Sequence, residues 1–310
     1  MKNRVQDLCI ILLMLILIIE FLMKKALIAD VIFYSLSVWV HQLLPSIFPF
    51  FVVSDILVSY HITNYIPKFI KNTFCTIFCV SENIATVFFL SIASGFPSNA
   101  RIIKMMYEQG SITEEEGNRA LLFTHFSNPL FILSTVAVMF LHQERYGYII
   151  LISHILGNVI IGIATRRMSA YSQYDYTQKK EKSQSFSKVF IQAIRSSIDT
   201  SLLILGTLTC FLIFSSLVVY HLHLNGYQEA IVKGILEITM GLKSLANTSV
   251  SDVYKVVIST MFLSFGGFAV HLQVISQIID TPVKYSYFFI SRIFHAVISG
   301  VICYLLFVII

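Results

Sequence analysis

Charged residues are scarce in this chain of 310 residues. Asp, Glu, Lys and Arg together make up 13% of it, half of the ~25% that is typical of a soluble domain. Hydrophobic residues reach 56%, against ~45–50% in soluble proteins, and the mean hydropathy is +0.77. A soluble fold of this size has too little polar surface to cover so much apolar material. Disorder requires the opposite composition. The sequence therefore predicts an all-α polytopic membrane protein.

The chain also lacks the motifs of soluble enzymes and metal sites. Its five cysteines lie in apolar runs, without a CxxC pair or a Cys/His ligand spacing, which argues against zinc and against a disulfide framework. GxGxxG, P-loop, HExxH and GxSxG signatures are absent. The net charge of +5 is not gathered in a basic stripe and fits Lys and Arg at membrane edges. We expect no enzyme activity, no cofactor, no metal and no nucleic-acid partner.

The N-terminus resembles a signal peptide but lacks a cleavage site. Lys2 and Arg4 precede the apolar run 8–23, and Lys24 and Lys25 follow it directly. No small-x-small pattern separates this run from the next one. We therefore expect residues 1–25 to form an uncleaved N-terminal span.

A polar segment divides the rest of the chain into two membrane halves. Residues 166–188 hold six basic and two acidic residues and no apolar run, which predicts a basic cytoplasmic linker. The halves are then 26–165 and 189–310. Because a spanning helix needs ~20 apolar residues, we expect about eight spanning helices with broken or re-entrant pieces among the shorter runs. The apolar runs are 8–23, 26–44, 47–60, 73–93, 129–141, 146–165, 199–221, 228–242, 254–265 and 285–310.

The two halves resemble each other weakly. Residues 89–96 (FLSIASGF) match residues 262–268 (FLSFGGF) with one deletion. An acid within an apolar run precedes each stretch, Asp55 in the first half and Glu237 in the second. We interpret the pattern as two imperfect repeats of inverted orientation, although chance similarity between Phe- and Gly-rich membrane segments is the alternative.

Breaks in the apolar runs point to a site. Gly95 frees the backbone and Pro97 suits the first position of a new helix, so we expect a helix to end near Ser94 and another to begin near Pro97. The second half breaks at Gly266-Gly267. Paired interruptions in two membrane halves are typical of a transporter site near the midplane, whereas the alternative is a pair of packing kinks.

A third break and several polar side chains lie at membrane depth. Asn128 and Pro129 have the pattern of an N-cap followed by a first helical residue. Arg292 is the strongest single candidate, because a buried guanidinium needs an acidic partner or an anionic ligand. The other polar residues at this depth include His154, Asn158, His271, Gln273 and His295.

Several of these motifs, in order, resemble the YlbJ-type sporulation integral membrane protein family. They are residues 44–51 (LPSIFPFF), 94–98 (SGFPS), 127–131 (SNPLF), 153–158 (SHILGN), 237–241 (EITMG), 265–274 (FGGFAVHLQV) and 292–295 (RIFH). The resemblance covers about residues 30–310. It implies a nucleoside-recognition "Gate" domain, similar to the core of concentrative nucleoside transporters. It also implies transport of dipicolinic acid, made in the mother cell, across the outer forespore membrane during sporulation.

Our hypothesis from the sequence is a multi-pass transporter with its site between the breaks. Free N–H groups at a helix start and an arginine suit a small planar dianion. The predicted substrate-binding residues are Ser94, Gly95, Pro97, Ser98, Asn99, Asn128, His154, Asn158, Gly266, Gly267, His271, Gln273 and Arg292. Asp55, Glu237 and His295 are predicted to gate the site, to pair with Arg292, or to carry a coupling proton or ion.

Other functions fit the same sequence. A transporter of nucleosides or another small metabolite would need side-chain amides and carboxylates more than an arginine. A non-transporting assembly factor for spore formation would tolerate changes of the polar residues at the breaks. The expected partners are the lipid bilayer and the small anionic substrate, with self-association into a homo-oligomer as a further expectation.

Overall fold

The computed structural model describes residues 2–168 and 185–309, and these residues form helices and connecting turns without a β-strand. The elements of the first half are α1 (Lys2–Met23), α2 (Lys25–Val38), η1 (Trp39–Leu43), α3 (Leu44–Ser59), η2 (Ile62–Tyr65), α4 (Lys68–Phe78), α5 (Glu82–Ser94), α6 (Ser98–Glu108), α7 (Glu114–Phe123), η3 (Phe131–Phe140) and α8 (Glu144–Ala164). Those of the second half are α9 (Phe186–His221), α10 (Gly226–Leu236), α11 (Ile238–Ala246), α12 (Asp252–Phe265), α13 (Gly267–Ile278) and α14 (Tyr285–Ile309). The prediction of an all-α polytopic membrane protein is confirmed.

Six described helices are long and apolar enough to cross a bilayer, or seven if the bent pair α4–α5 counts as one span. That count is lower than the expected eight for two reasons. The runs 26–44 and 47–60 join into one continuous helical segment, Lys25–Ser59. The run 73–93 is instead split between α4 and α5, which meet at 98°.

The joined segment Lys25–Ser59 stays helical although it contains two prolines. Pro45 lies in the first turn of α3, where its missing N–H is tolerated, and the π-helical turn η1 precedes it. Only Pro49 lies inside the helix. Since the residues on both sides are apolar, the segment remains a single span.

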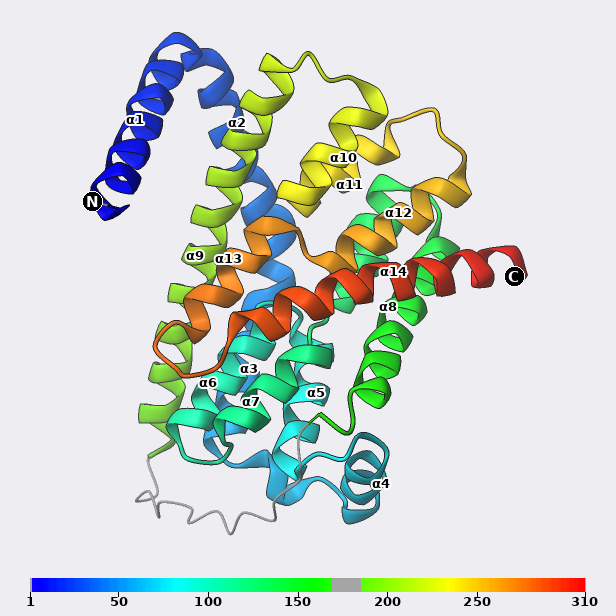
Figure 1. Cartoon of the computed structure of the whole chain (residues 1–310). Coiled ribbons are helices and arrows are strands. Elements are labelled where there is room, and N and C mark those ends of the chain that lie inside the picture. The colour runs from blue at the N-terminus through cyan, green and yellow to red at the C-terminus, as the bar shows by residue number, and fades with distance from the viewer. Residues whose placement is uncertain (1, 169–184, 310) are drawn as a thin grey trace.

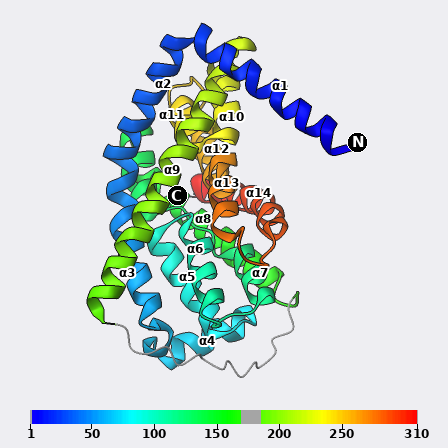
Figure 2. The ribbon, with the colours of Figure 1, turned by 90° about the vertical axis from the view of Figure 1, so that its left-hand side faces the viewer.

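The joined segment packs along α9, which has 36 residues and is therefore about 54 Å long (Figures 1 and 2). Polar contacts tie the two together: the Trp39 indole N–H donates to the carbonyl of Ser201 at 2.9 Å, and the hydroxyls of Ser35 and Thr209 are 2.8 Å apart. This pair of long helices forms one side of the molecule.

The remaining elements follow the same order in both halves. Two short helices joined by a tight turn come first (α5–α6 and α10–α11), an interrupted helix follows (α7–η3 and α12–α13), and a long helix ends each half (α8 and α14). In Figures 1 and 2, α5, α6 and α7 lie in the lower part of the molecule and α10 and α11 in the upper part. The two short-helix pairs therefore approach the centre from opposite ends, as an inverted arrangement requires.

The stretches matched in the sequence do not occupy corresponding elements. Residues 89–96 end at the turn between α5 and α6, whereas residues 262–268 end at the interruption of the later helix. By element order, the second-half counterpart of the first turn is Glu237, between α10 and α11. The match between these two stretches located two real interruptions, but the two do not correspond to each other in the order of the helices.

The N-terminal helix α1 stands apart from the body and packs only near its end (Figures 1 and 2). Glu20 contacts His221 at 2.9 Å, and Lys24 donates to the Tyr220 hydroxyl at 2.6 Å. Its apolar side chains are exposed, which suits contact with lipid. Most of the predicted basic linker, residues 169–184, lies outside the described residues, and residues 186–188 already belong to α9.

Candidate functional site

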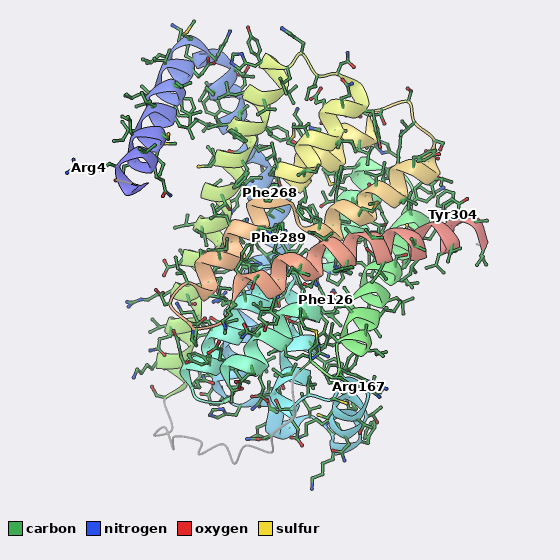
Figure 3. The ribbon with its side chains drawn as sticks, in the orientation of Figure 1. Arg4, Phe126, Arg167, Phe268, Phe289 and Tyr304 are labelled. Atoms are coloured by element: carbon green, nitrogen blue, oxygen red, sulfur yellow. The ribbon has the colours of Figure 1, made fainter. Side chains whose placement is uncertain are left out.

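Four helix interruptions meet in the middle of the molecule. They are the turn at 95–97 between α5 and α6, the segment 124–128 after α7, Glu237 between α10 and α11, and Gly266 between α12 and α13. Phe126, in the second of these segments, lies near the centre in Figure 3, far from the peripheral Arg4 and Arg167. The sequence predicted three of the four breaks and missed the one at Glu237.

Glycines let the interrupted backbones come close together. Gly95 has a φ of +75°, and a Cβ at this position would lie 2.6 Å from the backbone nitrogen of Asn128. Gly266 has a φ of +94°, and a Cβ there would lie 3.3 Å from Nε2 of His125. Only glycine adopts such backbone conformations without strain. The turn at 95–97 is therefore in contact with the segment 124–128, and this segment is also in contact with the interruption at Gly266.

The third interruption joins this group through the α10–α11 pair. A Cβ on Gly267 would lie 2.9 Å from the Ile238 side chain, directly after Glu237. Within the pair, the two backbones touch, because a Cβ on Gly241 would lie 2.1 Å from Cα of Gly234, and a Cβ on Gly234 would collide with the ring of Phe262 on α12. Two glycines and an acid inside the apolar run 228–242 are the sequence signal that could have revealed this turn.

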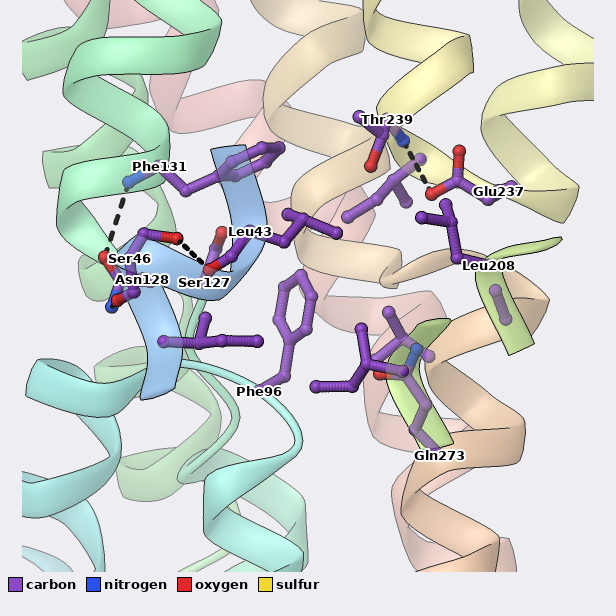
Figure 4. A pocket seen from close by; sticks show the side chains of 15 residues that line it. Leu43, Ser46, Phe96, Ser127, Asn128, Phe131, Leu208, Glu237, Thr239 and Gln273 are labelled. Carbon is purple, nitrogen blue, oxygen red and sulfur yellow. Dashed lines mark hydrogen bonds between the residues drawn. The ribbon is translucent and has the colours of Figure 1, made fainter. Parts of the chain in front are cut away.

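A small cavity lies between the interruptions (Figure 4). Its volume of about 40 Å³ is room for a few waters, given that one water needs ~10–15 Å³ by this measure. Phe96 stands in the middle of the lining, with Asn128 on one side and Gln273 and Glu237 on the other (Figure 4). The lining residues are Leu43, Ser46, Ile47, Phe96, Ser127, Asn128, Phe131, Ile204, Leu208, Glu237, Ile238, Thr239, Ala269, Val270 and Gln273.

Asn128 holds two of the broken backbones together. Its Nδ2 donates to the carbonyl of Ser46 at 2.9 Å and to those of Ala93 and Ser94, at the end of α5, at 3.3 and 3.4 Å. Its Oδ1 accepts from the backbone N–H of Leu130 at 2.8 Å and of Phe131 at 3.3 Å. The predicted N-cap is confirmed, and the amide is also the bridge between the first two interruptions.

Glu237 caps the start of α11. Its two carboxylate oxygens accept from the backbone N–H groups of Thr239 and Met240, both at 2.9 Å. A carboxylate at this end of a helix is favoured by the free N–H groups and by the helix dipole. The charged side chain of the cavity lining is therefore an acid, already bonded to the helix terminus.

Arg292 is completely buried, but it does not line the cavity and has no acidic partner among the described residues. Its guanidinium donates to the carbonyl of Leu122 at 2.8 Å, to Oδ1 of Asn158 at 3.1 Å and to Nδ1 of His295 at 2.8 Å. Leu122 lies in the last turn of α7, where a cation is favoured by unpaired carbonyls. The prediction that Asp55 or Glu237 pairs with Arg292 is wrong.

Asp55 pairs elsewhere. Its carboxylate on α3 accepts a hydrogen bond from Arg101 on α6, and both side chains are buried. The same guanidinium nitrogen donates to the hydroxyls of Ser196 at 2.9 Å and Ser197 at 3.1 Å, both on α9. This ion pair therefore ties the first short-helix pair to the two long helices. The sequence analysis did not single out Arg101.

The predicted histidines also serve the interrupted backbone. Nε2 of His154 accepts from the N–H of Ser127 at 2.9 Å. Nε2 of His271 donates to the carbonyl of Phe265, the last residue of α12, at 3.1 Å. Nε2 of His295 donates to the carbonyl of His154 at 2.8 Å. The rings of His154 and His271 thus bond to peptide groups at the ends of broken helices, whereas His295 bonds to a carbonyl inside the continuous helix α8.

The structure thus divides the predicted site residues into two groups. Asn128, Gln273 and Glu237 line the cavity. Ser94 and Ser98 bond to each other at 2.8 Å behind the first turn, and the others lie at or behind the interruptions without lining the cavity. Those others are Gly95, Pro97, Asn99, His154, Asn158, Gly266, Gly267, His271, Arg292, His295 and Asp55. The predicted site residues did not include Ser46, Phe96, Ser127, Phe131 and Thr239. Of these, Phe96, Ser127 and Phe131 adjoin predicted breaks, whereas Thr239 adjoins the unpredicted break at Glu237 and Ser46 lies within α3.

Comparison with known proteins agrees with this architecture. The chain is 27% identical over 308 aligned positions to the sporulation integral membrane protein YlbJ of Bacillus subtilis strain 168. The alignment covers 88% of this chain and 76% of that relative. This similarity supports the resemblance to the YlbJ-type family that the sequence motifs indicate. No family model matches the chain, and no solved structure does. The similarity thus extends over most of the chain.

Proposed function

We propose that this protein moves a small metabolite across a membrane of a sporulating cell, through the cavity between the four interruptions. The observation that carries the proposal is the meeting of broken helices at a small, mostly apolar cavity whose wall includes the polar side chains of Asn128, Glu237 and Gln273. Irregular backbone at membrane depth is stable only where protein covers it or where it lines a cavity. Paired broken helices are a typical setting for substrate sites in secondary transporters.

The cavity volume suggests that the site is closed in this conformation. A volume of about 40 Å³ does not admit an aromatic dicarboxylate or a nucleoside. Transport would therefore require movement of the short-helix pairs, whose turns form opposite walls of the cavity. Such movement, coupled to a proton or an ion, is our proposed mechanism of alternating access, with Asp55, Glu237 and His295 as the candidate gating or coupling residues.

Dipicolinate is the substrate that we propose first, at the outer forespore membrane. The proposal draws on the similarity to YlbJ, because this relative is a sporulation protein. It also draws on the buried Arg292, whose charge has no carboxylate partner among the described residues and makes the region behind the second interruption favourable for an anion.

An uncharged metabolite such as a nucleoside is the second candidate, favoured by a specific observation. Glu237 places a carboxylate on the cavity wall, opposite the amide of Asn128 and on the same side as that of Gln273 (Figure 4). Hydroxyl and ring N–H groups bond well to such side chains, whereas a dianion is repelled by the acid.

The experiment is uptake into liposomes that contain the purified full-length protein. We expect dipicolinate to accumulate faster than in empty liposomes, and the variants Ser127→Ala and Gln273→Leu to slow it. The exposed Asn72→Leu on α4 is the matched control and should transport normally. Uptake of uridine instead would select the second candidate. Uptake of neither, by protein that unfolds cooperatively on heating, would refute transport and favour an assembly role.

A further inference from the structure

Phe96 separates the cavity from two buried polar side chains. One face of its ring lines the cavity, and the ring stacks on that of His125 with centroids 5.2 Å apart and planes at 13°. Nδ1 of His125 lies 3.4 Å from Oδ1 of Asn99. Phe96 itself is half-buried, whereas His125 and Asn99 are 0% and 1% exposed. The aromatic ring thus covers a polar pair from the side of the cavity.

The covered pair has unused hydrogen-bonding capacity. Nδ2 of Asn99 and Nε2 of His125 have no hydrogen-bond partner within residues 2–168 and 185–309. Buried polar atoms are nearly always paired in native proteins, so such atoms call for an explanation. Nε2 of His125 faces Gly266, where a Cβ would come within 3.3 Å of it. In the part of the chain that the structure describes, the buried side-chain nitrogens left unpaired at the four interruptions therefore belong to two residues that contact each other.

The charges on the two sides of Phe96 differ in sign. Glu237 is on the far wall of the cavity, where its carboxylate is bonded to the start of α11 (Figure 4). Behind Phe96, the Arg292 guanidinium lies 3.4 Å from the carbonyl oxygen of His125. An anionic group is therefore favoured behind the ring, in the field of Arg292, and disfavoured at the outer wall.

We propose that Phe96 is a movable partition and that Asn99 and His125 form the inner half of the substrate site, which receives an anionic group when the ring swings aside. This assignment rests on the proposed transport function and names the part of the site that holds a carboxylate. It differs from the expectation that Arg292 binds the substrate directly. Arg292 acts through its charge, the Nδ2–H group of Asn99 donates to the carboxylate, and the Nδ1–H group of His125 holds Oδ1 of Asn99 so that this donor is kept in place.

The first arm of the test measures binding of dipicolinate to the full-length protein in lipid nanodiscs by calorimetry. We expect Asn99→Leu and His125→Phe to weaken dipicolinate at least tenfold. Pyridine-2-carboxylate, whose single carboxylate should occupy the same inner half, should lose a similar factor in the same variants, whereas uncharged uridine should lose less than threefold. Asn72→Leu is the control. Equal dipicolinate affinity in wild type and both variants, each folded by thermal unfolding, would overturn the assignment.

The second arm needs no substrate. The five native cysteines are replaced by serine, Asn99→Cys is introduced, and its reaction with a small water-soluble thiol reagent is timed. Phe96→Ala should accelerate the reaction at least tenfold. Phe89→Ala removes a part-exposed ring from α5 outside the cavity lining and should leave the rate unchanged. An unchanged rate in Phe96→Ala would overturn the partition.

The two arms distinguish this inference from the proposed function. If wild type binds no dipicolinate but Phe96→Ala still exposes position 99, the proposed substrate is wrong and the partition is retained. If wild type binds dipicolinate and neither the affinity nor the thiol reaction responds to the variants, the proposed function is retained and the partition is wrong.

Discussion

The Asp55–Arg101 ion pair gives the sharpest test of how this membrane fold is held together. Both residues are 3% exposed, and the pair joins α3 to α6 with Ser196 and Ser197 of α9 beside it. Removing one partner leaves an uncompensated buried charge, which costs about 3–5 kcal/mol. Arg101→Met and Asp55→Leu should therefore each destabilise the protein strongly.

The double variant should behave differently from the sum of the two. Oδ1 of Asp55 and both Nε and Nη1 of Arg101 lack a hydrogen-bond partner among the described residues, so the pair is incompletely satisfied. Replacing a buried ion pair by apolar residues of similar size is often neutral or stabilising. We expect Asp55→Leu/Arg101→Met to recover most of the stability that each single variant loses.

The assay is thermal unfolding in detergent at a constant heating rate, because unfolding of a membrane protein is commonly irreversible. At about 2 °C per kcal/mol, each single variant should unfold about 6–10 °C below wild type, and the double variant within about 3 °C of it. The lipid-exposed Phe33→Leu on α2 is the control. Single variants that match wild type, or a double variant with the summed loss, would refute the reasoning.

Three further outcomes follow from the site. Gly95→Ala should lower the stability measured by thermal unfolding by about 2–5 kcal/mol, since the new Cβ combines an unfavourable positive φ with a collision against Asn128. Gly110→Ala is the control: its φ is +69°, but nothing lies within 4 Å, so the loss should be only ~1–2 kcal/mol. Equal losses of stability in the two variants would contradict this prediction. Arg292→Lys should lower the free energy of unfolding by about 2–4 kcal/mol, because one ammonium group cannot reach all the acceptors that the guanidinium contacts. An unchanged melting temperature would contradict this structural role of Arg292. Glu237→Gln should tighten dipicolinate binding at least about fivefold in calorimetry and leave uridine unaffected, since like charges ~4 Å apart repel by about 1–4 kcal/mol. Weaker dipicolinate binding would show that the acid contacts the substrate.

Local chemistry explains which breaks could be predicted from the sequence. Gly95 with Pro97, Asn128 with Pro129, and Gly266 with Gly267 each carry residues that stop or start a helix whatever surrounds them. The turn at Glu237 depends instead on close packing of Gly234 against Gly241, which is a contact between two helices. Short-range signals do not include such contacts, and the run 228–242 therefore looked like one span.

The partners of the polar side chains could not be predicted in the same way. Arg292 meets carbonyls of α7 that lie 170 residues away in the sequence, and Asp55 meets Arg101 across three helices. Composition shows that a buried guanidinium needs acceptors, but it does not say whether a carboxylate, a substrate or the end of a helix provides them. Only the packing of the interrupted helices decides among these.

The number of helix interruptions limits how many polar groups are left for a substrate. Each break leaves peptide groups that must be bonded inside the bilayer, and Asn128, Glu237, Arg292 and His271 are used for this purpose. A side chain that forms a hydrogen bond to the backbone at an interruption cannot give up that bond without lowering the stability of the protein. A substrate must therefore bind to side chains that the breaks do not require, or it must replace their bonds one for one. Asn99 and His125 meet the first condition, which is why a solute that enters this protein should displace Phe96 before it disturbs Arg292.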